Sequence, residues 1–235
     1  PKTSGDVWVN GHSADRDARA VRRDIGVVFQ GHTLDRHLSV RENIIHRGAL
    51  YGLTRPQAEM RLNALAGRIG VTEFLGRRYG TLSGGQKRRA DILRALINEP
   101  RILILDEPTT GLDPHTRQSV WETILGLRRQ NGLTVFLTTH NMHVADQLCD
   151  RVAFIVDGTI KLLDTPTNLR LRAGDRRVRY TWREDGLQTG EYPLKTLCED
   201  GRFMALLQEG RLETLHTQEP SLSDLFIETT GRSLS

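Results

Sequence analysis

The sequence ILILDEP at residues 102–108 decides how the fold is predicted, and three short motifs surround it. These motifs are TLSGGQKRR at 81–89, GLDP at 111–114 and TTH at 138–140. Four apolar residues followed by two carboxylates are typical of a buried strand that leads to a polar site. Because ligands of open α/β sheets bind beyond the carboxyl ends of the strands, Asp106 and Glu107 are predicted to face a ligand.

Helices and further apolar strands alternate around this stretch. Nearly continuous apolar runs predict buried strands at 25–29, 102–105 and 133–137. Helical periodicity and N-cap residues predict helices at 83–97 and 113–132. Residues 39–70 are also helical in pattern, and no predicted strand interrupts them. We therefore expect an α/β fold with a mostly parallel sheet and a helical insert at about residues 38–97.

The sequence changes character after residue 150. Two strand-like runs, 152–156 and 159–163, flank Asp157-Gly158, a preferred dipeptide of tight hairpin turns. An arginine-rich stretch at 166–177 is predicted to be a linker. The tail predicts short strands and helices at 178–182, 189–192, 194–208, 212–217 and 221–230. The expected domains are therefore residues 1–170 and a small α+β domain at 171–235.

The composition is that of a globular protein with one sizeable domain and a small appendage. The 235 residues carry a formal net charge of +4, with no interleaved basic–aromatic motif, so we expect no nucleic-acid partner. No apolar run approaches the ~20 residues of a membrane-spanning helix. The two cysteines give no disulfide framework, which favours a reducing compartment such as the cytoplasm.

The carboxylates at the end of the central strand suit a nucleoside triphosphate site. Asp106 offers the oxygen ligands that Mg²⁺ prefers, and Gln30 at another strand end can reach metal or water through its amide oxygen. Glu107 suits the orientation or deprotonation of a water that attacks a phosphate. The plain alternative for Asp106 and Glu107 is that they only cap a neighbouring helix. The plain alternative for Gln30 is a polar residue at a strand exit.

A second group of candidates is suited to binding phosphate. Four of them lie at the start of the helix at 83–97: Ser83, Gly84, Gly85 and Gln86. Glycines there let backbone N–H groups approach an anion, and the helix dipole favours negative charge. His140 follows a strand and can donate a hydrogen bond to a phosphate oxygen. The alternatives are a serine N-cap before a flexible turn and a histidine bonded to a local carbonyl. Asp113 is first an N-cap, a role compatible with a second one across a subunit boundary.

Taken together, these motifs resemble those of the nucleotide-binding subunits of ABC transporters. Residues 82–86 match the signature motif, 102–107 the Walker B strand, and 111–113 the D-loop. The resemblance covers about residues 1–170 and implies a P-loop NTPase-type fold that binds ATP and Mg²⁺ between two such domains. The resemblance implies that Glu107 is the water-activating base. It also implies that His140, as the switch histidine, contacts the γ-phosphate. Asp106 and Gln30, the Q-loop glutamine, would bind Mg²⁺. Ser83, Gly84 and Gly85 would complete the site of the partner.

The end of the chain resembles the bacterial drug-export branch of that family. The resemblance rests on EPSLSDLF at 219–226 and on Thr230-Gly231, and the alternative is a generic amphipathic terminal helix. It implies that Mg-ATP hydrolysis at a dimer interface drives export by a separate integral-membrane permease. A second ABC ATPase subunit, in a homo- or heterodimer, and a cytoplasmic location on the inner face of the cell membrane are also implied.

One family motif, the phosphate-binding loop G-x-x-x-x-G-K-[ST], does not occur in these 235 residues. Without its backbone cradle and lysine the phosphates lack their main anchor. We therefore expect the chain as given to bind ATP weakly and to be inactive alone. The first residue, Pro1, favours a truncated piece of an ordinary ATPase. The alternative is a non-catalytic half-site subunit that lends its signature motif to the Walker A loop of another chain.

Overall fold

The computed structural model describes residues 3–172, 176–218 and 220–231. The chain divides into two compact units, residues 1–138 and 139–235. The first unit contains a parallel sheet and several helices, and the second contains a hairpin, an antiparallel sheet and further helices. Among the described residues, no helix combines the length and the apolar character that crossing a bilayer would require.

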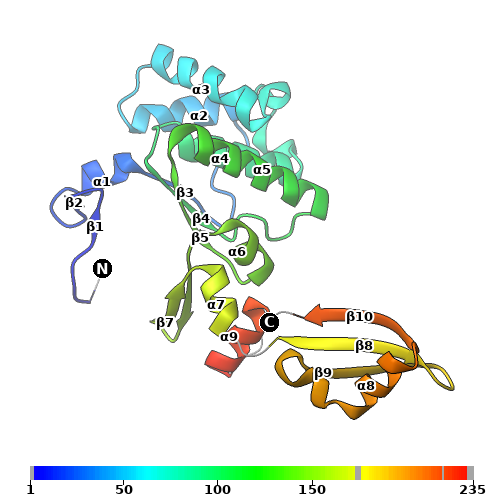
Figure 1. Cartoon of the computed structure of the whole chain (residues 1–235). Coiled ribbons are helices and arrows are strands. Elements are labelled where there is room, and N and C mark those ends of the chain that lie inside the picture. Colours follow the sequence, from blue (N-terminus) through cyan, green and yellow to red (C-terminus); the bar gives the residue numbers. More distant parts are fainter. Residues whose placement is uncertain (1–2, 173–175, 219, 232–235) are drawn as a thin grey trace. The chain divides into compact units, whose positions relative to one another are not determined.

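The first unit is built on three parallel strands in the order β3-β4-β5 (Figure 1). Their bounds are Ile25–Val28, Ile102–Asp106 and Thr134–Thr138. The register pairs Val28 with Leu105 and Asp106 with Thr138, so the carboxyl ends of the strands lie along one edge. Two long helices precede and follow β4, namely α4 (Gly84–Leu96) and α5 (Pro114–Asn131). The predicted order of strands and helices is confirmed, with small differences at their ends.

One face of this sheet is more deeply buried than the other. Its fully buried side chains include Val28, Leu103 and Leu105. Gly26 in β3 allows α4 to pack closely, because a Cβ there would lie 2.1 Å from the backbone oxygen of Ala95. The prediction of a buried strand at 133–137 is wrong in part: Phe136 is 57% exposed, because it lies with Val27 and Ile104 on the less buried face of the sheet.

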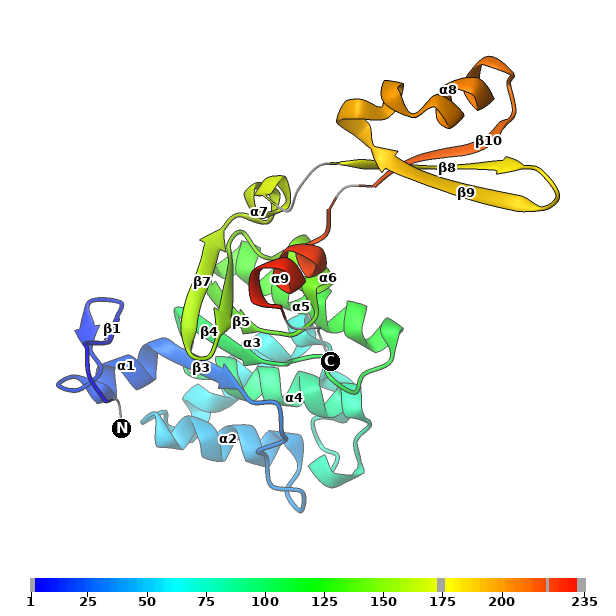
Figure 2. The same ribbon diagram turned by 90° about the horizontal axis from the view of Figure 1, so that it is seen from below.

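The predicted helical insert at about residues 38–97 contains α2, α3 and α4, with α2 and α3 packed against α4 (Figure 1). Their bounds are Val40–Leu50 and Arg55–Ile69, and each begins with a capping box. Two 3₁₀ turns, η1 (Thr72–Phe74) and η2 (Tyr79–Thr81), lead from α3 to α4. A small hairpin and a short helix precede β3 (Figure 2): β1 (Trp8–Val9), β2 (His12–Ser13) and α1 (Ala18–Asp24).

In the second unit, three helices share one buried core with the predicted hairpin of β6 (Val152–Val156) and β7 (Thr159–Asp164) (Figure 2). The helices are α6 (Met142–Leu148), α7 (Pro166–Arg172) and α9 (Leu222–Thr230). The prediction of a linker at 166–177 is wrong over residues 166–172, which form α7, and at Arg177, which begins the next strand. Residues 173–175 of that stretch lie outside the described residues. The physical reason for α7 is Leu169, which is fully buried with Phe154 and Leu225 and therefore orders the segment.

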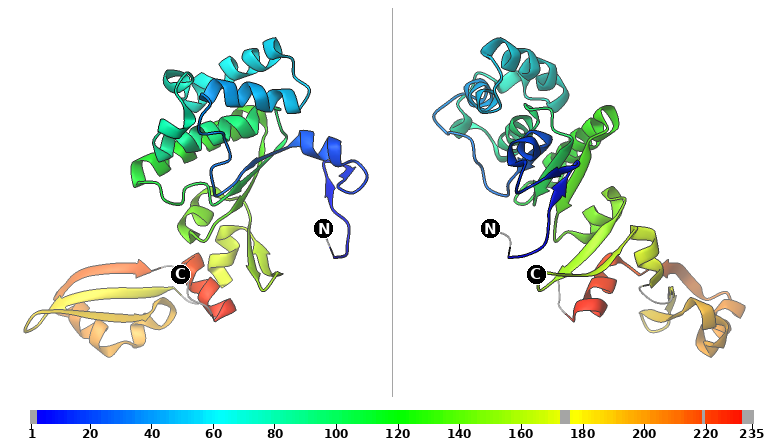
Figure 3. Two further views of the ribbon diagram at one scale, coloured as in Figure 1. Left: turned by 180° about the vertical axis from the view of Figure 1, so that it is seen from behind. Right: turned by 90° about the vertical axis from the view of Figure 1, so that its left-hand side faces the viewer.

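The rest of the second unit is an antiparallel sheet in the order β10-β8-β9 (Figure 3). The strands are β8 (Arg177–Arg183), β9 (Leu187–Pro193) and β10 (Leu212–Gln218). A 3₁₀ segment, η3 (Leu194–Glu199), and the helix α8 (Gly201–Gln208) cover one face, where Tyr180 and Trp182 pack against Phe203. The predicted α+β tail is confirmed in its elements.

Candidate functional site

The carboxyl edge of the parallel sheet carries three of the predicted site residues. Gln30 lies two residues after β3, Asp106 is the last residue of β4, and Glu107 follows directly. Because the two strands are parallel and Val28 pairs with Leu105, the structure brings these residues to the same edge. This edge is where α/β sheets bind their ligands.

Asp106 and Glu107 are both tied to Thr138 at the end of β5. The Thr138 hydroxyl donates to Oδ1 of Asp106 at 2.6 Å, and the Glu107 N–H donates to the Thr138 carbonyl at 3.1 Å. Oε2 of Glu107 accepts from the Thr110 hydroxyl at 3.1 Å. Glu107 has a φ of 44°, a left-handed conformation that costs a non-glycine residue roughly 1–2 kcal/mol. A strained carboxylate at a strand end is typical of a functional position.

The oxygen donors at this edge suit Mg²⁺ that arrives with a nucleotide. Asp106 offers a carboxylate and Gln30 an amide oxygen. Over the described ranges, no group of three or more His, Cys, Asp and Glu side chains is arranged to hold a metal by itself. Mg²⁺ in nucleotide sites keeps several waters and uses one or two carboxylates together with substrate phosphates. The residues present therefore fit a Mg-nucleotide better than a metal held by protein alone.

The start of α4 holds the second group of predicted residues. Ser83 is the N-cap: its Oγ accepts from the Gln86 N–H at 3.3 Å, and Oε1 of Gln86 accepts from the Ser83 N–H at 3.1 Å. The N-cap alternative for Ser83 is therefore what the structure shows. Gly84 and Gly85 form the first turn, and Gly84 is exposed, so the backbone at this end of α4 remains open to an anion.

The start of α5 lies against the start of α4. A Cβ on Gly85 would lie 2.3 Å from Cγ2 of Thr116, and one on Gly84 would lie 3.5 Å from Cδ2 of Leu112. Asp113 caps α5 by accepting from the Thr116 N–H at 3.0 Å, and the hydrogen bonds from Thr116 lower the pKa of the Asp113 carboxyl. The signature-like and D-loop-like residues thus form one surface at two helix N-termini.

His140 lies in the second unit, two residues beyond the end of β5. It is exposed, and the next residue, Asn141, caps α6 by accepting from the Val144 N–H at 3.2 Å. Its position after a strand is as predicted. Its contact with a phosphate remains a prediction.

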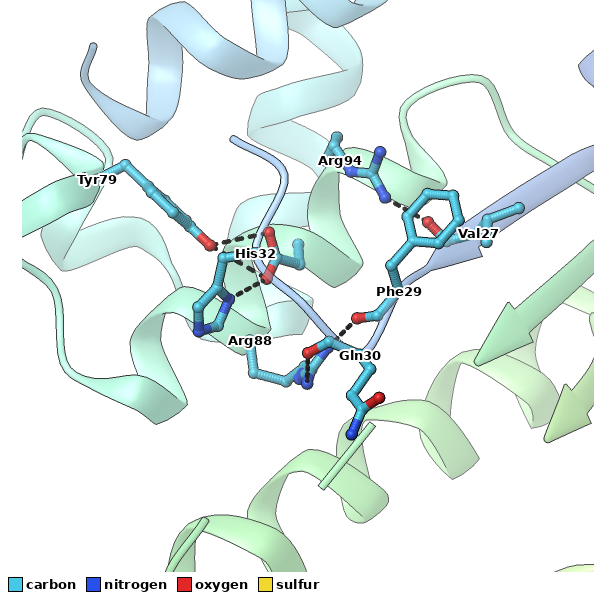
Figure 4. Close-up of polar contacts among 8 residues, drawn as sticks. Val27, Phe29, Gln30, His32, Tyr79, Arg88 and Arg94 are labelled. Atoms are coloured by element: carbon cyan, nitrogen blue, oxygen red, sulfur yellow. Dashed lines mark hydrogen bonds and ion pairs between the residues drawn. The ribbon is translucent and has the colours of Figure 1, made fainter. Parts of the chain in front are cut away.

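Motif reasoning missed a buried charged array on α4, whose first member is Arg88 (Figure 4). Arg88 is 3% exposed, and its guanidinium donates to the carbonyl of Phe29 at 2.7 Å and to that of Gln30 at 3.0 Å. The Gln30 side chain extends away from this guanidinium (Figure 4). Burial lowers the pKa of Arg88, and the carboxylates of Asp91 and Asp106 oppose that shift. The guanidinium is therefore within electrostatic reach of the predicted Mg²⁺ ligand.

Asp91 and Arg94 extend the array along α4. Asp91 is 2% exposed, accepts from the Tyr79 hydroxyl at 3.0 Å and lies 2.8 Å from Nδ1 of His32. Burial raises the pKa of Asp91, and these two hydrogen bonds oppose that shift. Arg94 donates to the carbonyl of Val27. The sequence does contain a signal for this array. Its ionisable side chains, Arg88, Asp91 and Arg94, recur every three residues and so share one face of a helix that comes between two buried strands in the sequence.

Comparisons with known proteins extend to most of the chain. The profile of the ABC transporter family matches residues 1–110, and that of the fluoroquinolone efflux ABC transporter C-terminal domain matches 176–219. A fluoroquinolones export ATP-binding protein of Mycobacterium tuberculosis is 41% identical over 214 residues, which cover 90% of this chain and 69% of that protein. A linearmycin resistance ATP-binding protein of Bacillus subtilis is 32% identical, with coverage of 100% and 83%.

Solved structures show the same fold. The structure of cbiO1 from Clostridium perfringens, part of the ABC transporter complex cbiONQ, matches with a TM-score of 0.65 and 27% identity over 71% of this chain and 68% of that one. A dimeric ATP-binding cassette in a post-hydrolysis state, bound to ADP and Pi, matches with a TM-score of 0.59 and 28% identity over 69% and 74%. The predicted α/β fold class is confirmed.

Proposed function

The chain belongs to the family of ATP-binding subunits of ABC transporters, and from this premise we propose that it hydrolyses Mg-ATP at a dimer interface to drive export by a separate permease. The observation that carries the proposal is the convergence of Gln30, Asp106 and Glu107 at the carboxyl edge of the sheet. The names of the relatives, which refer to fluoroquinolone export and linearmycin resistance, support a drug-like cargo.

Each residue at the sheet edge has a distinct proposed task. Glu107 orients the attacking water and accepts its proton, and its bond to Thr110 holds the carboxylate. Asp106 and Gln30 hold Mg²⁺, with Asp106 fixed by the Thr138 hydroxyl at 2.6 Å. His140 donates a hydrogen bond to the γ-phosphate. When bound, the nucleotide would supply the electrophilic phosphorus, and Mg²⁺ would neutralise charge on the phosphate oxygens.

The start of α4 is proposed to act on nucleotide held by a second ATPase subunit. Ser83, Gly84 and Gly85 present backbone N–H groups and the positive end of the helix dipole, which favour a phosphate. Gln86 keeps the turn in place through its bond with the Ser83 N–H. Asp113, beside this turn, lies on the same surface and is proposed to reach across the subunit boundary. The open backbone at Gly84 supports this role.

The partners proposed are therefore an integral-membrane permease and a second ABC ATPase subunit. The chain would work in the cytoplasm, as a peripheral subunit on the inner face of the cell membrane. Dimer assembly is supported by the similarity to the dimeric ATP-binding cassette. The family-level fold does not specify which permease is bound.

The absence of a G-x-x-x-x-G-K-[ST] sequence among the 235 residues leads to a quantitative expectation. Residues 1–235 by themselves are proposed to bind Mg-ATP no more tightly than about 1 mM, because the backbone cradle and lysine that anchor the phosphates are not in this sequence. Isothermal titration of the purified chain measures this affinity. Saturable micromolar binding would show that another part of the chain anchors the nucleotide.

The same absence supports one alternative, a non-catalytic half-site subunit that lends its signature motif to another chain. The two functions differ in what Glu107 does. A catalytic subunit needs its own Glu107, whereas a half-site partner needs only the start of α4. Substitutions at the two places therefore distinguish them.

The deciding experiment measures ATP turnover of the ATPase–permease assembly with Glu107→Gln. The expected result is a loss of roughly 10²–10⁴-fold, because the amide cannot accept the proton of water. Nucleotide binding should remain. The matched control is Glu122→Gln on the exposed surface of α5, where the carboxylate accepts from the Gln118 amide at 3.0 Å, so turnover should not change. Unchanged turnover with Glu107→Gln, together with loss for Gly84→Asp, would favour the half-site alternative.

A further inference from the structure

The backbone on both sides of the Gln30 side chain is attached to α4. Arg88 donates to two consecutive carbonyls, those of Phe29 at 2.7 Å and Gln30 at 3.0 Å. Two residues further along the chain, Nδ1 of His32 lies 2.8 Å from the Asp91 carboxylate. Both anchors are almost fully buried, at 3% and 2% exposure. The side chain of Gln30 itself points away from them (Figure 4).

We propose that Arg88 is a positioning residue for ATP hydrolysis, which fixes the Gln30 backbone and thereby the place of the Gln30 amide at the metal. This inference rests on the proposed function, because it assumes that Gln30 serves Mg²⁺. The guanidinium is a planar fork that satisfies two carbonyls in one geometry, which a lysine ammonium cannot reproduce. Asp91 holds His32, two residues after Gln30, so that Gln30 lies between two fixed points.

The same helix begins with the signature-like turn. Ser83 is the N-cap of α4 and Arg88 lies five residues later, about 7 Å along the helix axis. A single rigid helix therefore carries both the turn proposed to close over the nucleotide of a partner subunit and the residue that holds Gln30 at its own site.

The structural part of the inference is tested on the chain itself by backbone ¹⁵N relaxation. In the Arg88→Lys variant, the order parameters of the N–H groups of residues 29–32 should fall from about 0.85 to below about 0.6. The matched control is Arg89→Lys, whose guanidinium instead donates to Oγ of Ser119 at 2.6 Å, and it should leave these residues ordered. Unchanged order in Arg88→Lys, or an equal loss of order throughout the chain, would overturn the inference.

The functional part is tested by a double-mutant cycle on the Mg-ATPase of the complete assembly. Arg88→Lys should lower kcat about tenfold in the wild-type background and have no further effect in the Gln30→Ala background, because Arg88 acts through Gln30. Equal loss in both backgrounds would show that Arg88 acts independently of Gln30 and would contradict the proposal.

The two readouts separate this inference from the proposed function. An assembly without any Mg-ATPase would contradict the proposed function and, with it, the functional role of Arg88. The order parameters would then still decide whether Arg88 holds the backbone of residues 29–32. If the wild-type assembly hydrolyses Mg-ATP but Arg88→Lys leaves the order parameters of residues 29–32 unchanged, the proposed function stands and the role of Arg88 is removed.

Discussion

Glu107, the proposed water-activating residue, differs from its neighbours at the scale of one side chain. Its φ of 44° lies in the left-handed region, which disfavours any residue with a Cβ, yet a glutamate occupies it. The conformation is held by the Glu107 N–H, which donates to the Thr138 carbonyl at 3.1 Å. The carboxylate is thus retained at a cost in stability that a glycine would avoid.

This strain leads to a stability prediction. Glu107→Gly should have a higher free energy of unfolding than Glu107→Ala by about 1 kcal/mol, because alanine keeps the left-handed strain and glycine does not. Both variants lose the carboxylate and its Thr110 contact, so the comparison isolates the backbone. Urea unfolding of the two proteins measures the difference. Equal stabilities would show that φ at residue 107 relaxes once the side chain is removed.

Sequence reasoning predicted strand-end residues well and buried charged residues poorly. Asp106 and Glu107 follow an apolar run, so their place at a strand end could be predicted directly. Arg88 and Asp91 were missed because charged residues on a helix are usually exposed, and periodicity alone does not reveal that carbonyls and a tyrosine hydroxyl would satisfy them. Ser83 was predicted to bind phosphate, with an N-cap role as the alternative; the structure shows the N-cap, and the phosphate contact stays a prediction.

At the scale of elements, β3 and α4 pack closely at Gly26. Gly26 has no room for a side chain, since a Cβ would lie 2.1 Å from the Ala95 oxygen and 3.0 Å from Cγ of Pro100. The close packing brings Arg94 to the Val27 carbonyl and Arg88 to the residues after β3. The position of Gln30 therefore depends on a glycine in the preceding strand.

Gly26→Ala is accordingly predicted to lower the free energy of unfolding by about 1–3 kcal/mol or more, because the added methyl group forces α4 away from β3. The matched control is Gly67→Ala in α3, where nothing lies within 4 Å of the added Cβ. That change should raise stability by roughly 0.5–1 kcal/mol through helix propensity. Thermal and urea unfolding measure both. A neutral Gly26→Ala would mean that the contact between β3 and α4 adjusts freely.

Local chemistry determined how well individual elements could be predicted. The capping box of Ser39 and Glu42 and the turn at Asp157-Gly158 are encoded within four residues, and the structure contains both. The helix α7 was missed because its sequence is rich in arginine and begins at Pro166. Its order depends on Leu169, which is buried with residues of α9 far along the chain. Such a contact is not visible in a local pattern.

At the scale of the whole molecule, the chain places its proposed functions at different surfaces. The carboxyl edge of the sheet holds the residues for metal and water, and the N-termini of α4 and α5 hold the residues for a phosphate of another subunit. The order of motifs along the sequence predicted this division through family resemblance. Neither helical periodicity nor composition could do so, because neither indicates which residues meet across two chains.

The central claim is that two subunits share each site, with Glu107 supplied by one and the start of α4 by the other. Gly84→Asp places a carboxylate at that start, where the added Cβ would meet Leu112 at an ordinary 3.5 Å, so the change should repel a phosphate without disturbing the fold. Because residues 1–235 contain no G-x-x-x-x-G-K-[ST] sequence, the test uses an assembly built on two copies of this chain joined to a phosphate-binding loop. In that assembly, Glu107→Gln and Gly84→Asp should each be inactive alone.

The most direct measurement is ATP turnover after the two inactive variants are mixed in equal amounts. In a mixed dimer, both substitutions fall in one shared site and the other site is intact. Since half of randomly formed dimers are mixed, turnover should recover to about a quarter of the wild-type value. A mixture that stays as inactive as its two components would contradict the shared site.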